Sequence, residues 1–519
     1  MKRNFSALQD DFDLLVCGGG IYGAWTAYDA VLRGLKVALV EQGDWASATS
    51  CSSSKLIHGG LRYLETFDFK LVRKALKERQ MLLHIAPHRV WPLRFGVPVY
   101  ADSRNGMLKL KAGLTLYDTL AGFPGEPMRH HHFLKQEFSG RFPFLHDADL
   151  KGGFTYGDAQ TDDARLVLEL VAGAIGHGAV CVNYARLLEW NEEDGKVCGA
   201  TVQDGVGGDT VSVNARQCVS SAGPWTAATA QGRAWCRLSK GIHLVLPALP
   251  AQEAVLLTTK ADGRVFFMIP WYGRTLLGTT DTDYRGAIDH VAVDAEEVDY
   301  LLAAANDYLK TAWTRADVIG SYAGLRAMRQ SDAAHPSSVS RDWELKTAAN
   351  GVLHVVGGKL TSSREDAAVI VDRVCAQLGL DTVCATQDRR LPWKPQQDFS
   401  AWTTAMTEEA QRLGIDAESV GWLLRRHGER AVQVFRIVED TPQLAARIMS
   451  DLPFIHADLV FCAGDEMVQH LSDLLRRRMP LLILAKLDAQ ALSRLAELVA
   501  PQLGWDPERR AREVEACGK

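Results

Sequence analysis

The sequence has 519 residues, of which 47% are hydrophobic and 23% are charged, and its formal net charge is −5. This composition is typical of a soluble globular protein with two or three domains, and the charge gives no general attraction to nucleic acid or to an anionic membrane. The ten cysteines form no C-x-x-C pair, which argues against a zinc or iron–sulfur motif and favours a reducing, cytoplasmic setting. The first residues lack the apolar core of a signal peptide, and no run approaches the ~18 apolar residues of a membrane span.

The first predicted elements form a dinucleotide-binding unit. They are a buried strand (13–17), a glycine-rich turn (18–23), an alanine-rich helix (24–32), a second strand (36–40) and the acid Glu41. A lone G-x-G-x-x-G is a weak signal, because glycine-rich turns are common. Strand, turn, helix, strand and acid at this spacing together predict a dinucleotide site.

Each residue type in this unit has a physical reason. Gly18 permits the tight turn, Gly20 lets the backbone approach a pyrophosphate, and Gly23 lets helix and strand pack closely. The N-terminus of the helix supplies free N–H groups and a partial positive charge for the pyrophosphate. Glu41 can accept hydrogen bonds from a ribose 2′-OH.

The loop after Glu41 indicates which dinucleotide binds. Residues 47–55 are small and rich in hydroxyl groups, so they can lie close to a flat ring and donate many hydrogen bonds. The segment that follows from Ser53 reads SSKLIHGGLRYL, and it resembles the flavin-contacting signature of the FAD-dependent glycerol-3-phosphate dehydrogenases. This resemblance implies FAD as the cofactor.

The resemblance extends from residue 13 to about residue 478 and implies an α/β fold. It consists of a Rossmann-like FAD-binding domain of the glutathione-reductase/D-amino-acid-oxidase type, a mixed-sheet substrate domain and a C-terminal all-helical domain. The chain is expected to weave between the first two. We expect the FAD-binding domain at 1–80, 155–235 and 320–385, the substrate domain at 81–154 and 236–319, and the helical domain at 395–519.

After the flavin-like signature, the pattern alternates between helix and strand. Residues 69–85 predict an amphipathic helix, and residues 90–100, with Pro92 and Pro98, predict an edge strand or an extended crossing. The run Arg129-His130-His131-His132 invites a metal site. Adjacent histidines cannot all face one ion on a regular element, and no partner carboxylates stand nearby, so no metal is expected.

A second flavin contact is expected after an excursion of the chain. Residues 187–190, 197–203 and 211–214 predict a three-stranded antiparallel excursion beside the parallel sheet. The chain then returns as a strand that ends in Ala222-Gly223-Pro224-Trp225. This tetrapeptide resembles the place where the family's backbone passes close to the flavin.

The substrate pocket is inferred from motifs in the second half of the chain. Lys240-Gly241-Ile242-His243 and Gly278-Thr279-Thr280-Asp281 match the family together, and glycine-flanked Arg326 and Lys359 follow. The resemblance implies that the pocket is lined by Arg62, Tyr63, His243, Thr280, Arg326, Arg341 and Lys359.

These residue types suit the oxidation of a phosphorylated secondary alcohol. A phosphate dianion needs fixed planar donors, which arginine supplies as a fork and lysine as a point charge. We assign phosphate and C1-hydroxyl binding to Arg62, Tyr63, Arg326 and Lys359 collectively. His243 is the first choice for the base at the C2 hydroxyl, because its ordinary pKa lies nearest neutrality and neighbouring cations keep it neutral. Arg326 and Lys359 complete the expected catalytic group.

The expected cofactor contacts come from the glycine turn, the Ser-rich loop and two later glycine turns. They are Gly18, Gly20, Ile21, Tyr22, Gly23, Glu41, Thr49, Ser50, Ser53, Ser54, Lys55, Leu56, His58, Gly59, Gly60, Ala185, Gly223, Gly358, Lys359, Leu360 and Thr361.

The last third of the chain is predicted to be helical. Helix periodicity dominates from Pro395 on, over residues 408–413, 418–427, 443–449, 465–478 and 489–499. The run Arg476–Arg478 is interpreted as the cationic C-terminal end of a helix, with a membrane or partner contact as the alternative. Cys462 and Cys517 are the only cysteines there, so the chain resembles the single-polypeptide, quinone-linked type rather than the iron–sulfur type.

The expected activity is the oxidation of sn-glycerol 3-phosphate to dihydroxyacetone phosphate, with hydride transfer from C2 to flavin N5 and electrons passed to quinone. The alternatives are an oxidase that uses O₂, a dehydrogenase of a longer polyol phosphate, an NAD-linked dehydrogenase and a catalytically silent flavin-binding protein. Quinone lies in the bilayer, so peripheral contact with the inner face of the cell membrane is expected, through 71–79 or Arg476–Arg478. A homodimer is left open, and no nucleic-acid partner is expected.

Overall fold

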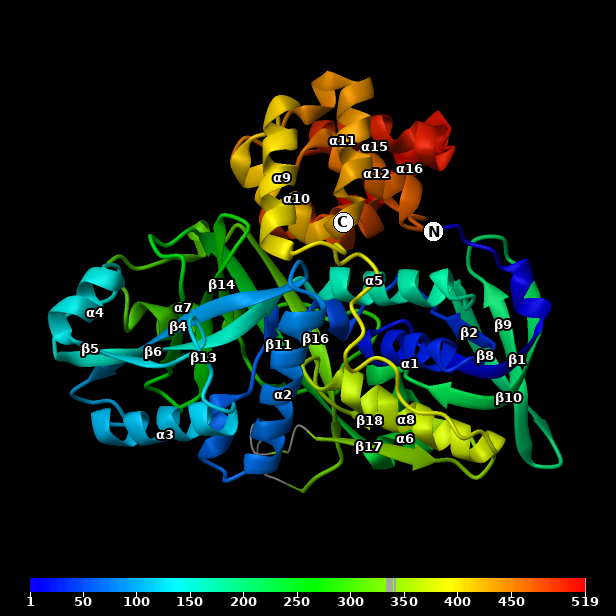
Figure 1. Cartoon of the computed structure of the whole chain (residues 1–519), viewed down its shortest axis with the longest axis horizontal. Helices are drawn as coiled ribbons and strands as arrows, with labels where there is room; N and C mark the ends of the chain where they lie inside the picture. Colours follow the sequence, from blue (N-terminus) through cyan, green and yellow to red (C-terminus); the bar gives the residue numbers. More distant parts are fainter. Residues whose placement is uncertain (333–338, 340–341, 519) are drawn as a thin grey trace.

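The computed structural model describes residues 1–332, 339 and 342–518, and it places two β-sheets beneath a layer of helices (Figure 1). The first sheet carries the glycine turn. Its strand order is β17, β18, β10, β1, β2 and β7, with all neighbours parallel except the β17–β18 pair. The strands are β1 (Asp11–Cys17), β2 (Val37–Val40), β7 (Val180–Val182), β10 (Thr210–Ser220), β17 (Trp343–Thr347) and β18 (Leu353–Gly357).

The predicted three-stranded excursion is confirmed. β8 (Ala185–Glu193) pairs antiparallel with β9 (Lys196–Asp204), and β9 pairs antiparallel with β10. β10 then continues into the centre of the sheet beside β1, so the excursion and the parallel core share one strand.

Three helices pack on the first sheet and make its core. They are α1 (Ile21–Leu32), α5 (Asp163–Gly176) and α8 (Ser363–Leu378). Buried apolar side chains from all three helices join those of β1 and β2 in one hydrophobic cluster. α5 begins at its N-cap Asp162, whose side chain accepts a hydrogen bond from the backbone N–H of Arg165.

The second sheet lies beside the first and is mixed. Its strand order is β15, β11, β14, β13, β12, β4, β6 and β3, with β16 paired to β11 and β5 paired to β6. The strands are β3 (Leu56–Ile57), β4 (Val90–Tyr100), β5 (His131–Leu134), β6 (Leu150–Thr161), β11 (Cys236–Pro247), β12 (Ala254–Thr258), β13 (Val265–Trp271), β14 (Arg274–Gly278), β15 (Thr282–Asp283) and β16 (Gly320–Arg329).

The prediction that residues 90–100 form an edge strand is wrong. β4 lies inside the sheet, paired along its length with β6 and also with β12. β12 pairs only with Phe95 and Gly96, which stand between Pro92 and Pro98. Neither proline therefore faces a β12 residue, and the strand tolerates two missing N–H donors in the interior of a sheet.

Two segments that the sequence assigned to the FAD-binding domain pair with strands of the second sheet. β3 belongs to the flavin-like signature yet pairs with β6 of the second sheet. β16 lies in the range 320–385, which the sequence assigned to the FAD-binding domain, yet it pairs along its whole length with β11. Both segments therefore belong to the second sheet, although the sequence assigned them to the FAD-binding domain.

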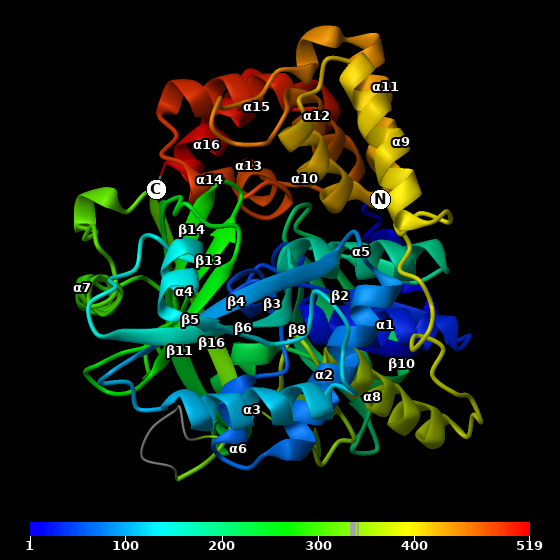
Figure 2. The same cartoon turned by 60° about the vertical axis from the view of Figure 1, so that its left-hand side comes forward.

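Helices cover the outer side of the second sheet, away from the C-terminal helices (Figure 2). α2 and α3 lie at the end of the molecule opposite the C-terminal helices in both views. The helices of this part are α2 (Phe69–Ile85), α3 (Met107–Leu120), α4 (Lys135–Arg141), α6 (Ala230–Trp235) and α7 (Ala295–Asn306).

The C-terminal third is helical, but two of the five helices that the sequence pattern predicted are not continuous. The expected helix 443–449 is a single 3₁₀ turn (Pro442–Ala445), and the expected helix 465–478 is broken into short pieces. The pieces end in the π-helical turn η9 (Leu474–Arg478). The helices are α9 (Phe399–Arg412), α10 (Ala417–His427), α11 (Ala431–Asp440), α12 (His456–Asp465), α13 (Leu471–Asp473), α14 (Leu481–Leu484), α15 (Ala489–Leu503) and α16 (Pro507–Cys517).

Aromatic packing and buried ion pairs join the helical third to both sheets. The ring of Trp422 in α10 lies 4.0 Å from that of Tyr272, which follows β13, and 5.8 Å from that of Trp91 in β4. Arg165 of α5 and Glu466 after α12 form an ion pair in which both side chains are fully buried. Among the helices that the structure describes, none combines the length and the apolarity needed to cross a membrane.

Candidate active site

The glycine turn is shaped by close backbone contacts. A Cβ atom on Gly23 would lie 1.8 Å from the carbonyl oxygen of Gly18, and one on Gly18 would lie 2.5 Å from the carbonyl oxygen of Ser221. Gly18 also has φ +109°, a conformation that glycine adopts at no steric cost. α1 can therefore start directly against the end of β1, with its first N–H groups at the turn.

Glu41 at the end of β2 holds the glycine turn from the side. Its carboxylate oxygens accept hydrogen bonds from the backbone N–H of Gly19, at 2.6 Å, and of Gly43, at 2.8 Å. Burial raises the pKa of Glu41, while these two N–H groups lower it. Its backbone oxygen accepts a further hydrogen bond from the N–H of Ala185.

A cavity of about 690 Å³ opens between the two sheets, beside the glycine turn. Most of the residues that the sequence predicted for the cofactor lie in its wall. They are Gly18, Gly20, Ile21, Tyr22, Glu41, Thr49, Ser50, Ser53, Ser54, Leu56, His58, Gly60, Gly223, Gly358, Lys359, Leu360 and Thr361. Of the residues predicted for the substrate, Arg62, Tyr63, His243, Arg326 and Lys359 line the same cavity.

Five predicted residues lie behind this wall. Gly23 packs under the turn, and Ala185 supports Glu41 from its far side. The N–H of Gly59 donates to the buried carboxylate of Asp158. Lys55 Nζ is buried 2.7 Å from Asp163, and Thr280 Oγ1 donates to Glu297.

These five residues support the cavity wall from behind and do not line the cavity. The prediction for Arg341 lies outside the described residues.

Two of the cations contact one aromatic ring at the substrate end of the cavity. Lys359 Nζ lies 3.9 Å from the centre of the Tyr63 ring, and the Arg62 guanidinium carbon lies 4.9 Å from it. Arg62 Nη2 also donates to the Tyr63 hydroxyl at 3.2 Å. Cation–π contacts of this kind hold long basic side chains in place, where the wall needs fixed charge.

Arg326 on β16 is the third cation, and it crosses over the backbone of β11. A Cβ atom on Gly241 would lie 2.2 Å from Arg326 Nη2, so this position has room only for glycine. The guanidinium donates to Thr279 Oγ1, at 2.9 Å, and to Asp281 Oδ1, at 3.3 Å. The negative charge of Asp281 also acts on Arg62.

Gly241, Thr279 and Asp281 line the cavity but were not among the predicted site residues. All three lie in the two motifs that the sequence analysis singled out, next to His243 and Thr280. The motifs therefore carried the signal, but the sequence did not tell which of their side chains face inward.

His243 lies at the same end and is held by its neighbours. Its ring stacks on that of Tyr322 at 4.8 Å and 16°, and its Nε2 lies 2.9 Å from Ser54 Oγ. Burial lowers the pKa of His243 well below its ordinary value, and the charges of Arg326 and Lys55 lower it further. The imidazole is therefore neutral at neutral pH and can accept a proton.

His58 in the cavity wall is kept neutral for similar reasons. Burial lowers its pKa to about 3, and the nearby charges of Lys359 and Arg62 contribute to the shift. Its backbone N–H donates to Thr361 Oγ1 at 3.2 Å, which ties the flavin-like signature to the later glycine turn. The cavity wall at this end is thus cationic, with two neutral imidazoles.

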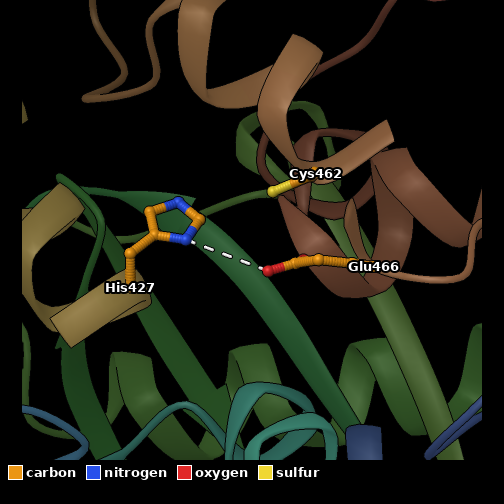
Figure 3. A group of neighbouring side chains, drawn as sticks. All are labelled: His427, Cys462 and Glu466. Atoms are coloured by element: carbon orange, nitrogen blue, oxygen red, sulfur yellow. Dashed lines mark ion pairs between the residues drawn. The ribbon is translucent and has the colours of Figure 1, made fainter. Parts of the chain in front are cut away.

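One buried cluster outside the cavity has side chains that could bind a metal ion. His427, Cys462 and Glu466 lie together in the helical third (Figure 3). Glu466 already pairs with Arg165 and Arg430, so an ion there would face two arginines. Burial raises the pKa of Cys462, and a thiol that keeps its proton is a poor ligand. The cluster is an ion-pair network that joins α5 to the helical third.

Comparison with known proteins agrees with this geometry and defines the class of protein. Residues 13–364 match the family described as FAD dependent oxidoreductase, and residues 384–510 match the family described as the C-terminal domain of alpha-glycerophosphate oxidase. The two-sheet fold with its glycine turn and cavity is therefore that of an FAD-dependent oxidoreductase, whose cofactor is FAD.

Individual relatives narrow the class to one family. The chain is 35% identical to a glycerol-3-phosphate dehydrogenase of Synechocystis sp., over 99% of this chain and 97% of the relative. It is 34% identical to the aerobic glycerol-3-phosphate dehydrogenase of Bacillus subtilis, over 92% of this chain and 90% of the relative. The chain belongs to the glycerol-3-phosphate dehydrogenase and oxidase family.

Solved structures show the same fold. The glycerol-3-phosphate dehydrogenase of Bacillus halodurans, solved with FAD, superposes with a TM-score of 0.80 at 29% identity, over 99% of this chain and 95% of that one. The L-alpha-glycerophosphate oxidase of Mycoplasma pneumoniae superposes with a TM-score of 0.56 at 18% identity, over 74% of this chain and 100% of that one. The latter likeness is one of fold alone.

Features of the cavity itself also fit FAD. Gly223 lines the cavity, and a Cβ atom there would meet nothing within 4 Å, so the wall leaves open space at the predicted second flavin contact. Ser221 Oγ, in the same wall, is buried and has no hydrogen-bond partner within the described part of the chain. The cavity runs from Glu41 at one end to Arg326 at the other, which gives an elongated dinucleotide and a small substrate separate places.

Proposed function

We propose that the chain oxidises sn-glycerol 3-phosphate to dihydroxyacetone phosphate and passes the electrons to a quinone. The observation that carries this proposal is the substrate end of the cavity. There, three cations from distant segments line the cavity together with the neutral base His243. The cations are Arg62, Arg326 and Lys359. The family relationship supports the phosphate ester of a small alcohol as the substrate class.

The cations suit a phosphate dianion because each is fixed by a different contact. Arg326 offers a planar fork, oriented by Thr279 and Asp281. Lys359 and Arg62 both contact the Tyr63 ring. We assign phosphate and C1-hydroxyl binding to these residues collectively, and a charge-assisted contact to a dianion in this partly closed space is stronger than one in water.

His243 then acts on the C2 hydroxyl. Its Nε2 is the nitrogen that faces Ser54 in the cavity wall, and it accepts the hydroxyl proton in place of that hydrogen bond. The stacked Tyr322 ring keeps the imidazole plane fixed while the proton moves. FAD, when bound, accepts the hydrogen and the electron pair that leave C2.

An anaerobic experiment tests the proposal. Glycerol 3-phosphate is added to the yellow protein without oxygen, and the flavin absorbance is followed before a water-soluble quinone or air is admitted. We expect bleaching by the substrate and faster recovery with quinone than with O₂. No bleaching by glycerol 3-phosphate, with bleaching by a longer polyol phosphate, would reassign the substrate.

The main competing function is an oxidase that reduces O₂. The match of residues 384–510 to the C-terminal domain of alpha-glycerophosphate oxidase favours keeping it as the second candidate. Rapid recovery of the flavin in air, with slow recovery by quinone, would establish it. A catalytically silent flavin-binding protein is disfavoured, because such a protein has no need for three cations around a neutral imidazole.

A quinone in the bilayer requires contact with a membrane, and only part of the surface first expected to make it is exposed. Arg477 and Arg478 are buried, and α2 pairs its Lys74 with Asp366 and buries its Arg79 on Asp158. Arg73, Lys77 and Arg476 remain exposed. The sequence could not tell this, because the partner acids lie far away along the chain.

We propose that the start of α2 and the helix α3 form the bilayer contact. Phe67 lies just before α2, Leu108 at the start of α3 and Phe123 just after its end, and they are exposed by 77%, 86% and 73%. α2 and α3 contact each other. Lys109 and Lys111 stand beside Leu108 and are also exposed. Apolar side chains with a cationic rim suit an anionic leaflet, at about 1 kcal/mol per well-placed cation.

Vesicle sedimentation tests this contact. Leu108→Glu should reduce binding to vesicles of mixed anionic and zwitterionic lipid and should leave reduction of a water-soluble quinone unchanged. Val383→Glu is the matched control, because Val383 is 82% exposed and lies in the loop that follows α8. Equal binding by both variants would remove α3 from the contact.

A further inference from the structure

The carboxylate of Asp44 is the meeting point of the FAD-binding turn and the helical third. Arg477 Nε donates to Asp44 Oδ2 at 2.6 Å, and Arg478 donates to both oxygens, at 2.6 and 2.9 Å. Asp44 is 1% exposed, Arg477 9% and Arg478 1%. We call these three residues the Asp44 clamp. Both arginines come from η9, more than 400 residues away along the chain.

Asp44 lies in the loop that shapes the glycine turn. The ring of its neighbour Trp45 covers Gly19 so closely that a Cβ atom there would lie 2.5 Å from it. The N–H of Ala46 donates to the Gly19 carbonyl at 3.0 Å, and Glu41 accepts from the Gly19 N–H at 2.6 Å. The turn is therefore bonded on both sides by residues 41–46.

This loop needs support from outside itself. Ala46 has φ +61°, a conformation that residues with a side chain seldom adopt and that persists only when the surroundings impose it. A second route leads to the same helical segment. Arg477 also donates a hydrogen bond to Asp473, and Asp473 accepts another from the hydroxyl of Tyr184. The backbone N–H of Tyr184 in turn donates to the Gly43 carbonyl.

The buried charges of the clamp are favourable only while they remain paired with one another. A buried carboxylate is unfavourable without partners, and a buried guanidinium is too. Burial alone raises the pKa of Asp44, but Arg478 and Arg477 together lower it to about 2, so the carboxylate stays charged. If η9 moved away, Asp44 would have to take up water or a proton, and the loop that carries Trp45 and Ala46 would open with it.

We propose that Asp44, Arg477 and Arg478 are positioning residues through which the helical third holds the FAD-binding turn in shape, so that FAD binding and docking of the helical third are coupled. Because coupling is reciprocal, bound FAD should stabilise the docking of η9 as much as docked η9 favours FAD. The proposal concerns FAD retention and does not depend on which substrate or acceptor the enzyme uses.

A matched pair of variants tests it. Asp44→Asn removes the charge of the clamp. Asp458→Asn removes an equally buried carboxylate that binds Arg426 and His427, all within the helical third. The measurements are the dissociation constant of FAD from the apoprotein, by flavin fluorescence, the melting temperature, and kcat at saturating FAD.

We expect Asp44→Asn to raise the FAD dissociation constant about tenfold or more while kcat at saturating FAD changes less than about twofold. Asp458→Asn should lower the melting temperature yet keep the FAD dissociation constant within about twofold of wild type. Unchanged FAD affinity in Asp44→Asn, or an equal loss in both variants, would overturn the proposal.

The wild-type protein provides a test that does not depend on a variant that folds. Hydrogen exchange is measured with and without FAD. Amides of residues 471–478 should gain protection with FAD together with residues 42–46, whereas α15 should not respond. Protection confined to residues 42–46 would show that FAD does not reach the helical third, and the coupling would be rejected.

Discussion

The two ends of the cavity are built in different ways. The cofactor end is built on residues 18 to 60, joined by later segments at Gly223 and Gly358, and its shape depends on backbone contacts such as that between Gly23 and the Gly18 carbonyl. The substrate end is assembled from Arg62, His243, Arg326 and Lys359, which four distant segments supply. The first end is therefore sensitive to the size of one residue, and the second to the charge and orientation of side chains.

The largest expected effect breaks the cofactor end alone. Gly23→Val should abolish FAD binding, because a Cβ atom would lie 1.8 Å from the Gly18 carbonyl oxygen and force α1 away from β1. Purified wild-type protein should be yellow and the variant colourless. Gly176→Val is the control, since a Cβ atom there meets nothing within 4 Å, and it should remain yellow. A yellow Gly23→Val protein would contradict the assignment.

The next effect leaves the cofactor end intact and removes the base. His243→Asn should keep the flavin spectrum and lower kcat on the order of 10²–10⁴-fold, the usual contribution of a general base. Rapid-mixing measurement of flavin reduction isolates the chemical step. A rate within threefold of wild type would move the base to another residue.

Removal of one cation should have a similar or smaller effect. Arg326→Ala should cost on the order of 2–5 kcal/mol in kcat/KM for glycerol 3-phosphate, again with an intact flavin spectrum. Arg326→Lys should recover only part of the loss, because lysine has no planar fork to match Thr279 and Asp281. Wild-type kinetics in Arg326→Ala would place the phosphate elsewhere.

The smallest expected effect is that of pH, because the activity should not change near neutrality. The pKa of His243 lies well below 6.5, so the imidazole stays deprotonated and active as pH falls through 6.5. It loses activity only when pH falls through its lowered pKa. The profile of kcat at saturating glycerol 3-phosphate should therefore be flat between about pH 6 and 7. This readout is chosen over kcat/KM because the second pKa of a free phosphate ester is about 6 and would shape the latter. A fall with a midpoint near 6.5 would mean that the base has an ordinary histidine pKa.

The sequence predicted the cofactor end better than the substrate end for a physical reason. The strands and helix around the turn were placed within a few residues, because hydrophobic periodicity and glycine spacing are local signals. Which side chains of the Gly278–Asp281 motif face inward depends on strand register, and Asp281 rather than Thr280 lines the cavity.

The long-range contacts were the least predictable. Nothing local to Arg477 or Arg478 indicates that Asp44 is their partner, so two arginines of a run interpreted as the cationic end of a helix are buried on a distant acid. Lys55, placed in a flavin-like signature, likewise turns away from the cavity to pair with Asp163. β4 shows the same limit, because prolines that suggest an edge are tolerated where the neighbouring strand pairs only between them.

The most direct measurement compares two substrates on one loaded enzyme. Under anaerobic conditions, flavin reduction by glycerol 3-phosphate and by glycerol is measured in the wild type and in Arg326→Ala. If the cations bind the phosphate, glycerol 3-phosphate should reduce the wild-type flavin far faster than glycerol, and Arg326→Ala should lose most of that preference while reacting with glycerol as the wild type does. Equal rates with the two substrates in the wild type, or a preference unchanged in Arg326→Ala, would contradict a phosphate site built around Arg326.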